Sequence, residues 1–328
     1  MDPRLLKYYN QELQYIRKMG AEFATEYPKI AGRLGMEGID CADPYVERLL
    51  EGFAFLAGRV QLKLDSEFPR FTQHLLEAVY PHYLAPTPSM AVVQFQPDLT
   101  ESGLAEGFKV AKDSAIRSLL GPNDQTSCEY RTTEELTLYP LEITDIKYFN
   151  SLSGTGLPSV KGAKAAIRMR LTATAGVTFD KLDLSRLPIY LKGADSLPMK
   201  LYEQFVGNCI SVVVQPTGRP PAWQQIAPEV KVKPIGLDQG QHLLPMSPRS
   251  FQGYRLLHEY FAFPERFMFF EVSGLEEVCK RCTGDELELI FMLNTEDEFV
   301  HKSVTVDNFA LFATPVINLF PKYLDRVH

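Results

Sequence analysis

The sequence predicts an α+β fold, with an N-terminal α-helical domain followed by antiparallel β-sandwich-like domains that carry inserted helices. Over the first quarter of the chain, apolar residues recur every three or four positions, which is the period of a helix surface. Beyond the proline-rich stretch YPHYLAPTPSM, apolar residues alternate with polar ones, as they do in half-buried strands. Turns rich in Gly and Ser, such as SLSGTGLPSVKG, suit an antiparallel sandwich better than βαβ crossovers. We expect domains at residues 1–88, 89–216 and 217–328, the last with a helix near 250–260.

The first helix is expected in LLKYYNQELQYIRKMGAEF, where the apolar residues form two stripes about 100° apart. One stripe consists of Leu6, Tyr9, Leu13, Ile16 and Phe23, and the other of Leu5, Tyr8, Tyr15 and Met19. The apolar arc of this helix is therefore wide.

The stretch DPYVERLLEGFAFLAGRVQLKLDSEFP predicts a second helix. Asp43 can cap its start, Pro44 fits its first turn, and Pro69 is expected to end it. One continuous stripe of this helix is expected to be core, and it consists of Val46, Leu50, Phe53, Ala57, Val60 and Leu64. Phe55 and Leu62 fall on roughly the opposite side, because two residues of helix rotate the chain by about 200°.

A third helix is expected in FPRFTQHLLEAVY, where it would bury Phe68, Phe71, Leu75 and Val79 before Pro81 ends it. The second side of the preceding helix also needs a cover, because leaving Phe55 and Leu62 exposed would forgo roughly 1.5–3 kcal/mol each. Either the β-domains of the same chain or an external partner could supply it, and spacing alone does not separate these alternatives.

The later part of the chain contains strands whose two faces differ. AAIRMRLT sends Ile167, Met169 and Leu171 to one face and Arg168 and Arg170 to the other. CISVVVQP is a short apolar run, which is typical of a strand covered on both faces. In DELELIFML, one face is lined by Leu287, Leu289, Phe291 and Leu293. Helices are expected at 197–208 and 250–260, and Ser250 is a candidate cap for the second.

Charge and composition exclude several classes of protein. The formal charge of the 328-residue chain is −7 at pH 7 and no long basic run occurs, which argues against nucleic-acid binding. The start, MDPRLLKYYNQEL, lacks the continuous apolar core of a secretory signal. The apolar stretch FALFATPVINLFP is interrupted by Pro315 and is shorter than the roughly 20 residues that span a membrane. The five cysteines have no framework spacing and fit reduced thiols, so we expect a cytoplasmic protein without direct membrane insertion.

The clearest chemical candidate is the pair Cys279 and Cys282, since two thiolates at this spacing can share a zinc ion or form a redox disulfide. A structural zinc site needs four ligands, and neither a second CxxC nor an HxxxH pair follows. His258-Glu259 resembles the start of a metalloprotease helix, but Ala262 stands where the second His would be needed. We therefore predict no catalytic, cofactor-binding or metal-binding residues. A carbohydrate-binding or metal-dependent enzyme on a β-sandwich scaffold is the alternative.

The most distinctive blocks of the sequence are long ones. They are MDPRLLKYYNQELQYIRKMGAEFATEYPKIAGRLG, CADPYVERLLEGFAFLAGRVQLKLDSEFPRFTQHLLEAVYPHYLAPTPSMAVVQF, LPMSPRSFQGYRLLHEYFAFPERFMFF and ATPVINLF. In these blocks the chain resembles the TssF family, the baseplate subunits of bacterial type VI secretion systems, also called VasA or ImpG. Strings of this length are far more specific than the short motifs considered above.

The resemblance implies a structural, non-catalytic component of the baseplate wedge. Two TssF copies would join one TssG, with TssK and TssE, around a VgrG-type spike hub, as the platform on which tube and sheath assemble. The baseplate would be docked near the inner membrane complex. Family members continue well beyond NLF, so the resemblance also implies that this chain is an N-terminal fragment.

The resemblance also favours an external partner for the helical region. A protein present twice beside a different subunit needs helices that associate with other chains, and heptad-like stripes have that geometry. We therefore expect residues 1–80 to carry much of the contact to TssG or to a second TssF copy. The candidate interface residues are Leu6, Tyr9, Leu13, Ile16, Phe55 and Leu62.

Overall fold

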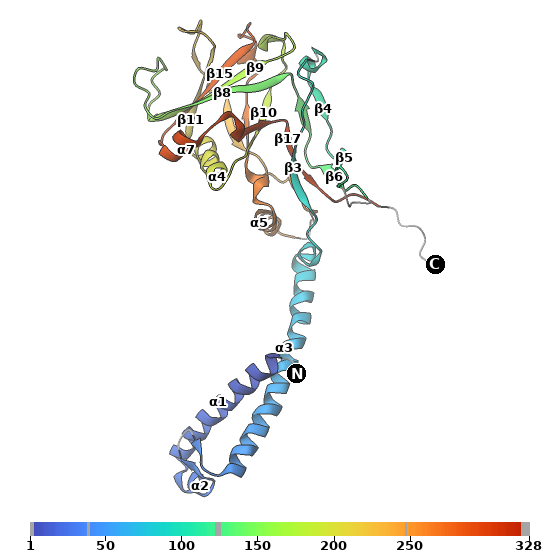
Figure 1. Ribbon diagram of the computed structural model, residues 1–328, viewed down its shortest axis with the longest axis vertical. Helices are drawn as coiled ribbons and strands as arrows, with labels where there is room; N and C mark the ends of the chain where they lie inside the picture. The colour runs from blue at the N-terminus through green and yellow to red at the C-terminus, as the bar shows by residue number, and fades with distance from the viewer. Residues whose placement is uncertain are drawn as a thin grey trace, which may run out of the picture. The chain divides into compact units, whose positions relative to one another are not determined.

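The computed structural model describes residues 3–37, 40–100, 102–121, 126–246, 248 and 250–322. The chain divides into two compact units, one up to Ala85 and one from Pro86 onward (Figure 1). The first unit is helical and the second is rich in antiparallel sheet, so the predicted α+β class is confirmed.

The first unit consists of three helices and short connecting elements. The helices are α1 (Pro3–Glu26), α2 (Pro28–Arg33) and α3 (Pro44–Val79), followed by the 3-10 turn η1 (Pro81–Leu84). Between α2 and α3, the two-residue strands β1 (Met36–Glu37) and β2 (Asp40–Cys41) pair with each other. As predicted, the Asp43 side chain caps α3 by accepting a hydrogen bond from the Tyr45 N–H at 2.8 Å, and Pro44 lies in the first turn.

The prediction that Pro69 ends this helix is wrong, because α3 continues through Pro69 to Val79. Proline lacks an N–H and its ring crowds the carbonyl four residues earlier, which is a local cost of about 3 kcal/mol. The residues that follow, FTQHLLEA, include several good helix formers and no glycine, so helix resumes after a single lost hydrogen bond. The predicted second and third helices are therefore one.

Helix α1 packs antiparallel against the N-terminal part of α3 (Figure 1). Arg17 in the second half of α1 forms an ion pair with Glu47 at 3.1 Å, whereas Tyr8 in the first half donates a hydrogen bond to Asp65. The two helices approach closely at Gly58, where an added Cβ would lie 3.0 Å from the backbone nitrogen of Tyr9. The small residues Gly58 and Ala54 are buried there and let the two backbones approach closely.

This packing leaves half of the predicted core stripe of α3 exposed. Phe53, Val60 and Leu64 are 64%, 59% and 57% exposed, whereas Val46, Leu50 and Ala57 are half-buried. The four residues expected to be buried in the third helix are also exposed, namely Phe68, Phe71, Leu75 and Val79. The physical reason is that α1 lies against the side with small side chains. A 3,4 pattern alone does not tell which side of a helix is approached most closely.

The second unit contains a sandwich of two antiparallel sheets that enclose its main core. The five-stranded sheet has the order β12-β11-β15-β9-β8, with β8 (Leu141–Phe149), β9 (Ala165–Ala173), β11 (Cys209–Pro216), β12 (Gln225–Ile226) and β15 (Glu286–Leu293). The four-stranded sheet has the order β13-β14-β10-β16, with β10 (Arg186–Leu191), β13 (Lys231–Pro234), β14 (Phe269–Ser273) and β16 (Phe309–Leu311). Strands β9, β11 and β15 confirm the predicted strands, including the burial of both faces of β11.

A helical segment packs against strands of both sheets. Helix α4 (Leu197–Tyr202) continues into one π-helical turn, η4 (Glu203–Gly207). The ring of Phe205 stacks on Phe270 of β14 with a centroid distance of 4.4 Å and meets Phe291 of β15 edge-on at 4.9 Å. The helix predicted at 197–208 therefore exists, and its second part places an aromatic side chain in the core.

A third sheet joins the two ends of the second unit. Its order is β3-β17-β6-β5, with β3 (Met90–Gln94), β5 (Ala115–Arg117), β6 (Glu129–Thr132) and β17 (Ala313–Ile317). A smaller pair consists of β4 (Phe108–Val110) and β7 (Leu136–Leu138). We expected a domain boundary at 216–217, but β11 and β10 pair with β15 and β14 from beyond it. That position therefore lies inside one folded unit.

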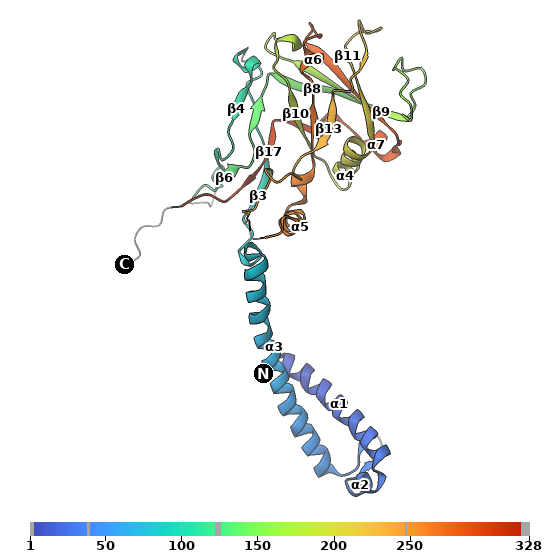
Figure 2. The same ribbon diagram turned by 180° about the vertical axis from the view of Figure 1, so that it is seen from behind.

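The other helical elements lie around these sheets. They are α5 (Gln252–Ala262), α6 (Glu276–Cys279), α7 (Glu298–Ser303), and the 3-10 turns η2 (Ser102–Glu106), η3 (Phe179–Lys181), η5 (Pro264–Phe267) and η6 (Val306–Asn308). Helices α4 and α7 lie side by side in both views (Figure 2). The proposed cap Ser250 is wrong, because the N-cap position of α5 is Phe251 and no side chain caps it.

Gly58→Leu should weaken the packing of α1 on α3, because its Cβ would press on the backbone of Tyr8 and Tyr9. We expect the free energy of unfolding of the helical unit to fall by about 1–3 kcal/mol. Gly52→Leu is the matched control, since a Cβ at Gly52 meets nothing within 4 Å and Leu favours helix by roughly 1 kcal/mol. Far-UV circular dichroism melts of both variants check this, and equal melting would contradict the close approach.

Candidate protein–protein interface

The six predicted interface residues all lie on the α1–α3 pair. Leu6 is exposed on α1, whereas Tyr9, Leu13 and Ile16 are half-buried. On α3, Phe55 is 38% exposed and Leu62 is half-buried. Leu62 lies one turn beyond Gly58 on the same side of α3, and Phe55 follows the buried Ala54. The side of α3 that needed a cover is therefore partly covered by α1.

The larger uncovered surface lies elsewhere on α3. We define the outer stripe as ten apolar residues spaced three or four apart along the whole helix, every one of them exposed: Tyr45, Leu49, Phe53, Leu56, Val60, Leu64, Phe68, Phe71, Leu75 and Val79. Its steps average roughly 3.8 residues, slightly more than one helical turn, so the stripe winds slowly around α3. Sequence reasoning divided these residues between two helices because Pro69 was expected to separate them.

Helix α1 is too short to follow α3 along its whole length. With about 1.5 Å of rise per residue, the 24 residues of α1 span roughly 36 Å and the 36 residues of α3 roughly 54 Å. Because Tyr8 of α1 already meets Asp65, the last turns of α3 extend past the start of α1 (Figure 1). The exposed residues Phe71, Leu75 and Val79 lie in those turns.

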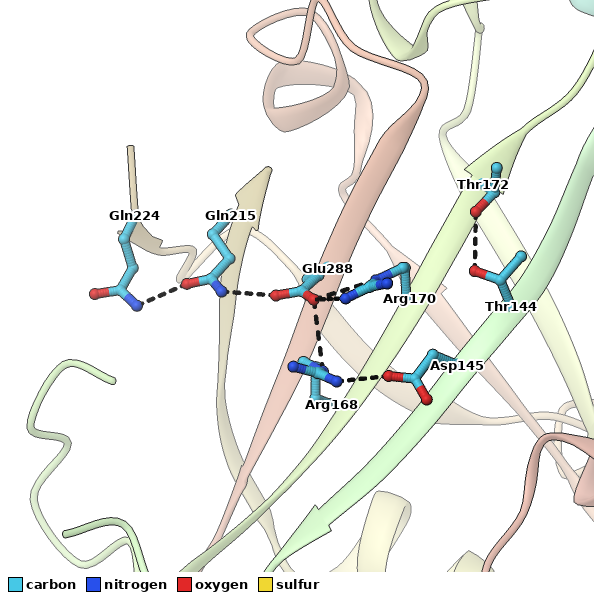
Figure 3. A network of polar contacts seen from close by, with 8 residues as sticks. All are labelled: Thr144, Asp145, Arg168, Arg170, Thr172, Gln215, Gln224 and Glu288. Atoms are coloured by element: carbon cyan, nitrogen blue, oxygen red, sulfur yellow. Dashed lines mark hydrogen bonds and ion pairs between the residues drawn. The ribbon is translucent and has the colours of Figure 1, made fainter. Parts of the chain in front are cut away.

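A row of paired polar side chains crosses one face of the five-stranded sheet (Figure 3). The carboxylate of Glu288 on β15 accepts hydrogen bonds from Arg170 on β9 at 2.9 Å and from Gln215 on β11 at 2.7 Å. Arg168, also on β9, forms ion pairs with Glu288 and with Asp145 of β8, the second at 2.5 Å. These contacts bury Arg168, although alternation alone placed it on a polar face. Both carboxylates are bound by guanidinium groups, so the row ties four strands together rather than presenting an open acid–base pair.

A second buried ionic cluster holds α5 against the sheet unit. Oε1 of Glu259 accepts hydrogen bonds from the N–H groups of Leu243 and Leu244, each at 3.0 Å. The same oxygen accepts from Arg255 at 3.0 Å, and Oε2 accepts from Arg266 Nε at 2.6 Å. Burial by itself would raise the pKa of Glu259, but Arg266, the Leu244 N–H and Arg255 together lower it below its usual value. The carboxylate is therefore charged at neutral pH.

Sequence reasoning noticed Glu259 only for its neighbour His258 and missed this cluster. The available signal was the Arg255–Glu259 spacing of four residues, which places both side chains on one side of a helix. Nothing in the spacing indicated that this charged side would face inward.

Cys279 and Cys282 lie in the main core as free thiols. Burial, together with the neighbouring Cys282, raises the pKa of Cys279 to about 12, and burial also raises the pKa of Cys282. The Cys282 thiol donates a hydrogen bond to the Glu286 carbonyl at 3.5 Å. In the part of the chain that the structure describes, no group of three His, Cys, Asp or Glu side chains is placed to hold a metal ion. Among the same residues, no helix is long and apolar enough to cross a membrane.

Comparisons with known proteins agree with the resemblance seen in the sequence. A sequence profile of the family described as "Type VI secretion system, TssF" matches residues 1–328. The chain is 53% identical over 331 residues to the type VI secretion system component TssF1 of Pseudomonas aeruginosa strain PAO1. That alignment covers 100% of this chain and 53% of the relative, so the chain spans about half the length of the curated relative that it matches.

The fold also has a counterpart among solved structures. It resembles a chain in a cryo-electron microscopy structure of the type VI secretion system TssK-TssF-TssG baseplate subcomplex, with a TM-score of 0.64 and 29% sequence identity. The similarity covers 84% of this chain and 49% of that chain.

The buried environment predicts that Cys279 and Cys282 react slowly with thiol reagents. At pH 8, a thiol with a pKa of about 12 is ionised to roughly one part in ten thousand, and the thiolate is the reactive form. In the native protein we expect a disulfide reagent to modify the exposed Cys128 quickly, and Cys279 and Cys282 only after unfolding. Cys128→Ser is the control that removes the fast phase. Rapid native modification of the pair, or stoichiometric zinc that is lost in Cys282→Ser, would contradict this.

Proposed function

Because the chain belongs to the TssF family of the type VI secretion system, we propose that it is a structural, non-catalytic component of the baseplate wedge. The observation that carries this proposal is the match of the family profile to the whole chain. We expect the protein in the bacterial cytoplasm, in a baseplate docked near the inner membrane complex. Its partners are TssG, a second TssF copy, TssK, TssE and the VgrG-type spike hub.

The similar solved chain supports the proposal for two of these partners, since that structure is described as a TssK-TssF-TssG subcomplex. The helical unit supplies the physical support for association. Its outer stripe exposes ten large apolar side chains, and a contiguous apolar surface on this scale marks an interaction site in soluble proteins. Burying one such side chain contributes roughly 1.5–3 kcal/mol, so a partner helix along α3 would gain a large free energy.

We place the contact to TssG or to the second TssF copy on the α1–α3 pair. The candidate residues Leu6, Tyr9, Leu13 and Ile16 form one side of α1, and Phe55 and Leu62 flank its contact with α3. The outer stripe extends this candidate surface along the whole of α3. A repeat slightly longer than one helical turn favours a partner helix that winds around α3 with a right-handed twist.

The enzyme alternative gains no specific support from the described residues. Glu288 and Glu259 are bound by arginines, and the two cysteines of the CxxC motif lie in the core. We therefore propose no second function.

Two double variants test the interface: Phe55→Glu with Leu62→Lys, and Phe53→Glu with Val60→Lys in the outer stripe. We expect each to reduce the amount of TssG that co-purifies by about tenfold or more, because charged side chains would have to be desolvated in the contact. Leu119→Glu, an exposed apolar residue in the sheet unit, is the control and should leave the complex unchanged. An unchanged complex from folded versions of both double variants would refute the assignment.

A further inference from the structure

Helix α5 buries its charged side and exposes its apolar side, which is the reverse of an ordinary surface helix. Its buried residues are Arg255 and Glu259, whereas Leu257 and Phe261 are 57% and 80% exposed. A surface helix normally buries its apolar side and exposes its charges. The ionic cluster around Glu259 fixes this orientation, since both of its carboxylate oxygens are bound from inside the sheet unit. The apolar side of α5 is therefore held outward.

The outward side of α5 borders an apolar groove of about 410 Å³. Leu256, Leu257 and Tyr260 of α5 form one wall, and Met199 and Tyr202 of α4 form another. Leu237, Phe267 and Met268 complete the lining. An apolar groove between two helices has the shape that accepts one side of an amphipathic helix, with apolar anchors three, four or seven residues apart.

The border of this groove carries an excess of negative charge. An adjoining pocket of about 220 Å³ shares Met199 and Met268 and is lined by Asp195, Glu265 and Lys192. Asp238 is exposed next to Leu237 on the other border. Within the described part of the chain, no cation forms an ion pair with any of these three carboxylates. Three carboxylates and one lysine favour an occupant with Lys or Arg beside its apolar anchors.

We infer that this groove binds an amphipathic helix of a different protein, with large apolar side chains on one side and basic residues flanking them. A second copy of this chain is a poorer occupant, because the whole chain has a formal charge of −7 and would bring further negative charge to an acidic border. The inference rests on the proposed function to the extent that the occupant is sought among the other baseplate subunits. It assigns them a second contact, on the sheet unit, separate from that of the α1–α3 pair.

Site-specific photo-crosslinking in the assembled complex tests the inference. The full-length protein, with a benzophenone amino acid at Leu257, is co-expressed with TssG and TssK, and the same substitution at Leu119 is the control. We expect an adduct at position 257 that maps to a basic amphipathic helix of TssG or TssK, and none at 119. An adduct to a second copy, an adduct within the same polypeptide, or no adduct above the control would each overturn the inference.

Charge and apolar variants add an equilibrium measurement. Leu257→Asp, and separately Asp195→Lys with Glu265→Lys, should each weaken binding of the crosslinked subunit by about tenfold, with unchanged melting temperatures. Unchanged binding in both would overturn the inference. If the complex still co-purifies in full while position 257 gives no adduct, only this inference fails. If TssG and TssK do not co-purify with the unmodified protein, the proposed function fails.

Discussion

The close approach of α1 and α3 at Ala54 and Gly58 decides which side chains of the helical unit face outward. Two helix backbones can come this close only where the facing side chains are small. Small residues leave little apolar area to bury, so the large side chains of α3 lie outside the contact. The contact between α1 and α3 that stabilises the helical unit is thus narrow, and the unit exposes a long apolar stripe. In this arrangement, the contact that folds the unit and the exposed apolar stripe lie on different sides of the same helix.

In the sheet unit, helix α5 also exposes large apolar side chains while a different side of the helix makes the inner contact. Glu259 is fully buried and binds Arg255 and Arg266, which keeps the charged side of α5 inward and its apolar side outward. A buried ionic cluster is a costly way to stabilise a helix, since apolar residues of similar volume are often as stabilising. It does, however, fix the orientation of α5. Both units therefore combine a firmly held inner contact with an apolar outer surface.

Much of the fold could be predicted from the sequence, because local rules decide it. The cap at Asp43, the alternation in β9 and the apolar run of β11 each depend on a few neighbouring residues. The continuation of α3 through Pro69 could not be predicted, since a proline that ends most helices costs this one a single hydrogen bond. The side of α3 that packs in the unit could not be predicted either. Periodicity gives two candidate sides, and only the packing of α1 selects one of them. The inward charges of α5 depend on Arg266 and on the Leu243 and Leu244 amides, which the fold brings together.

We propose that another subunit completes the apolar surface of α3. Hydrogen–deuterium exchange of the full-length protein, alone and in complex with TssG, tests it most directly, because covering a helix slows the opening of its backbone hydrogen bonds. We expect slower exchange along Pro44–Val79 in the complex, continuing past Pro69 into the last turns. Identical exchange of this helix in the free and bound protein would contradict it.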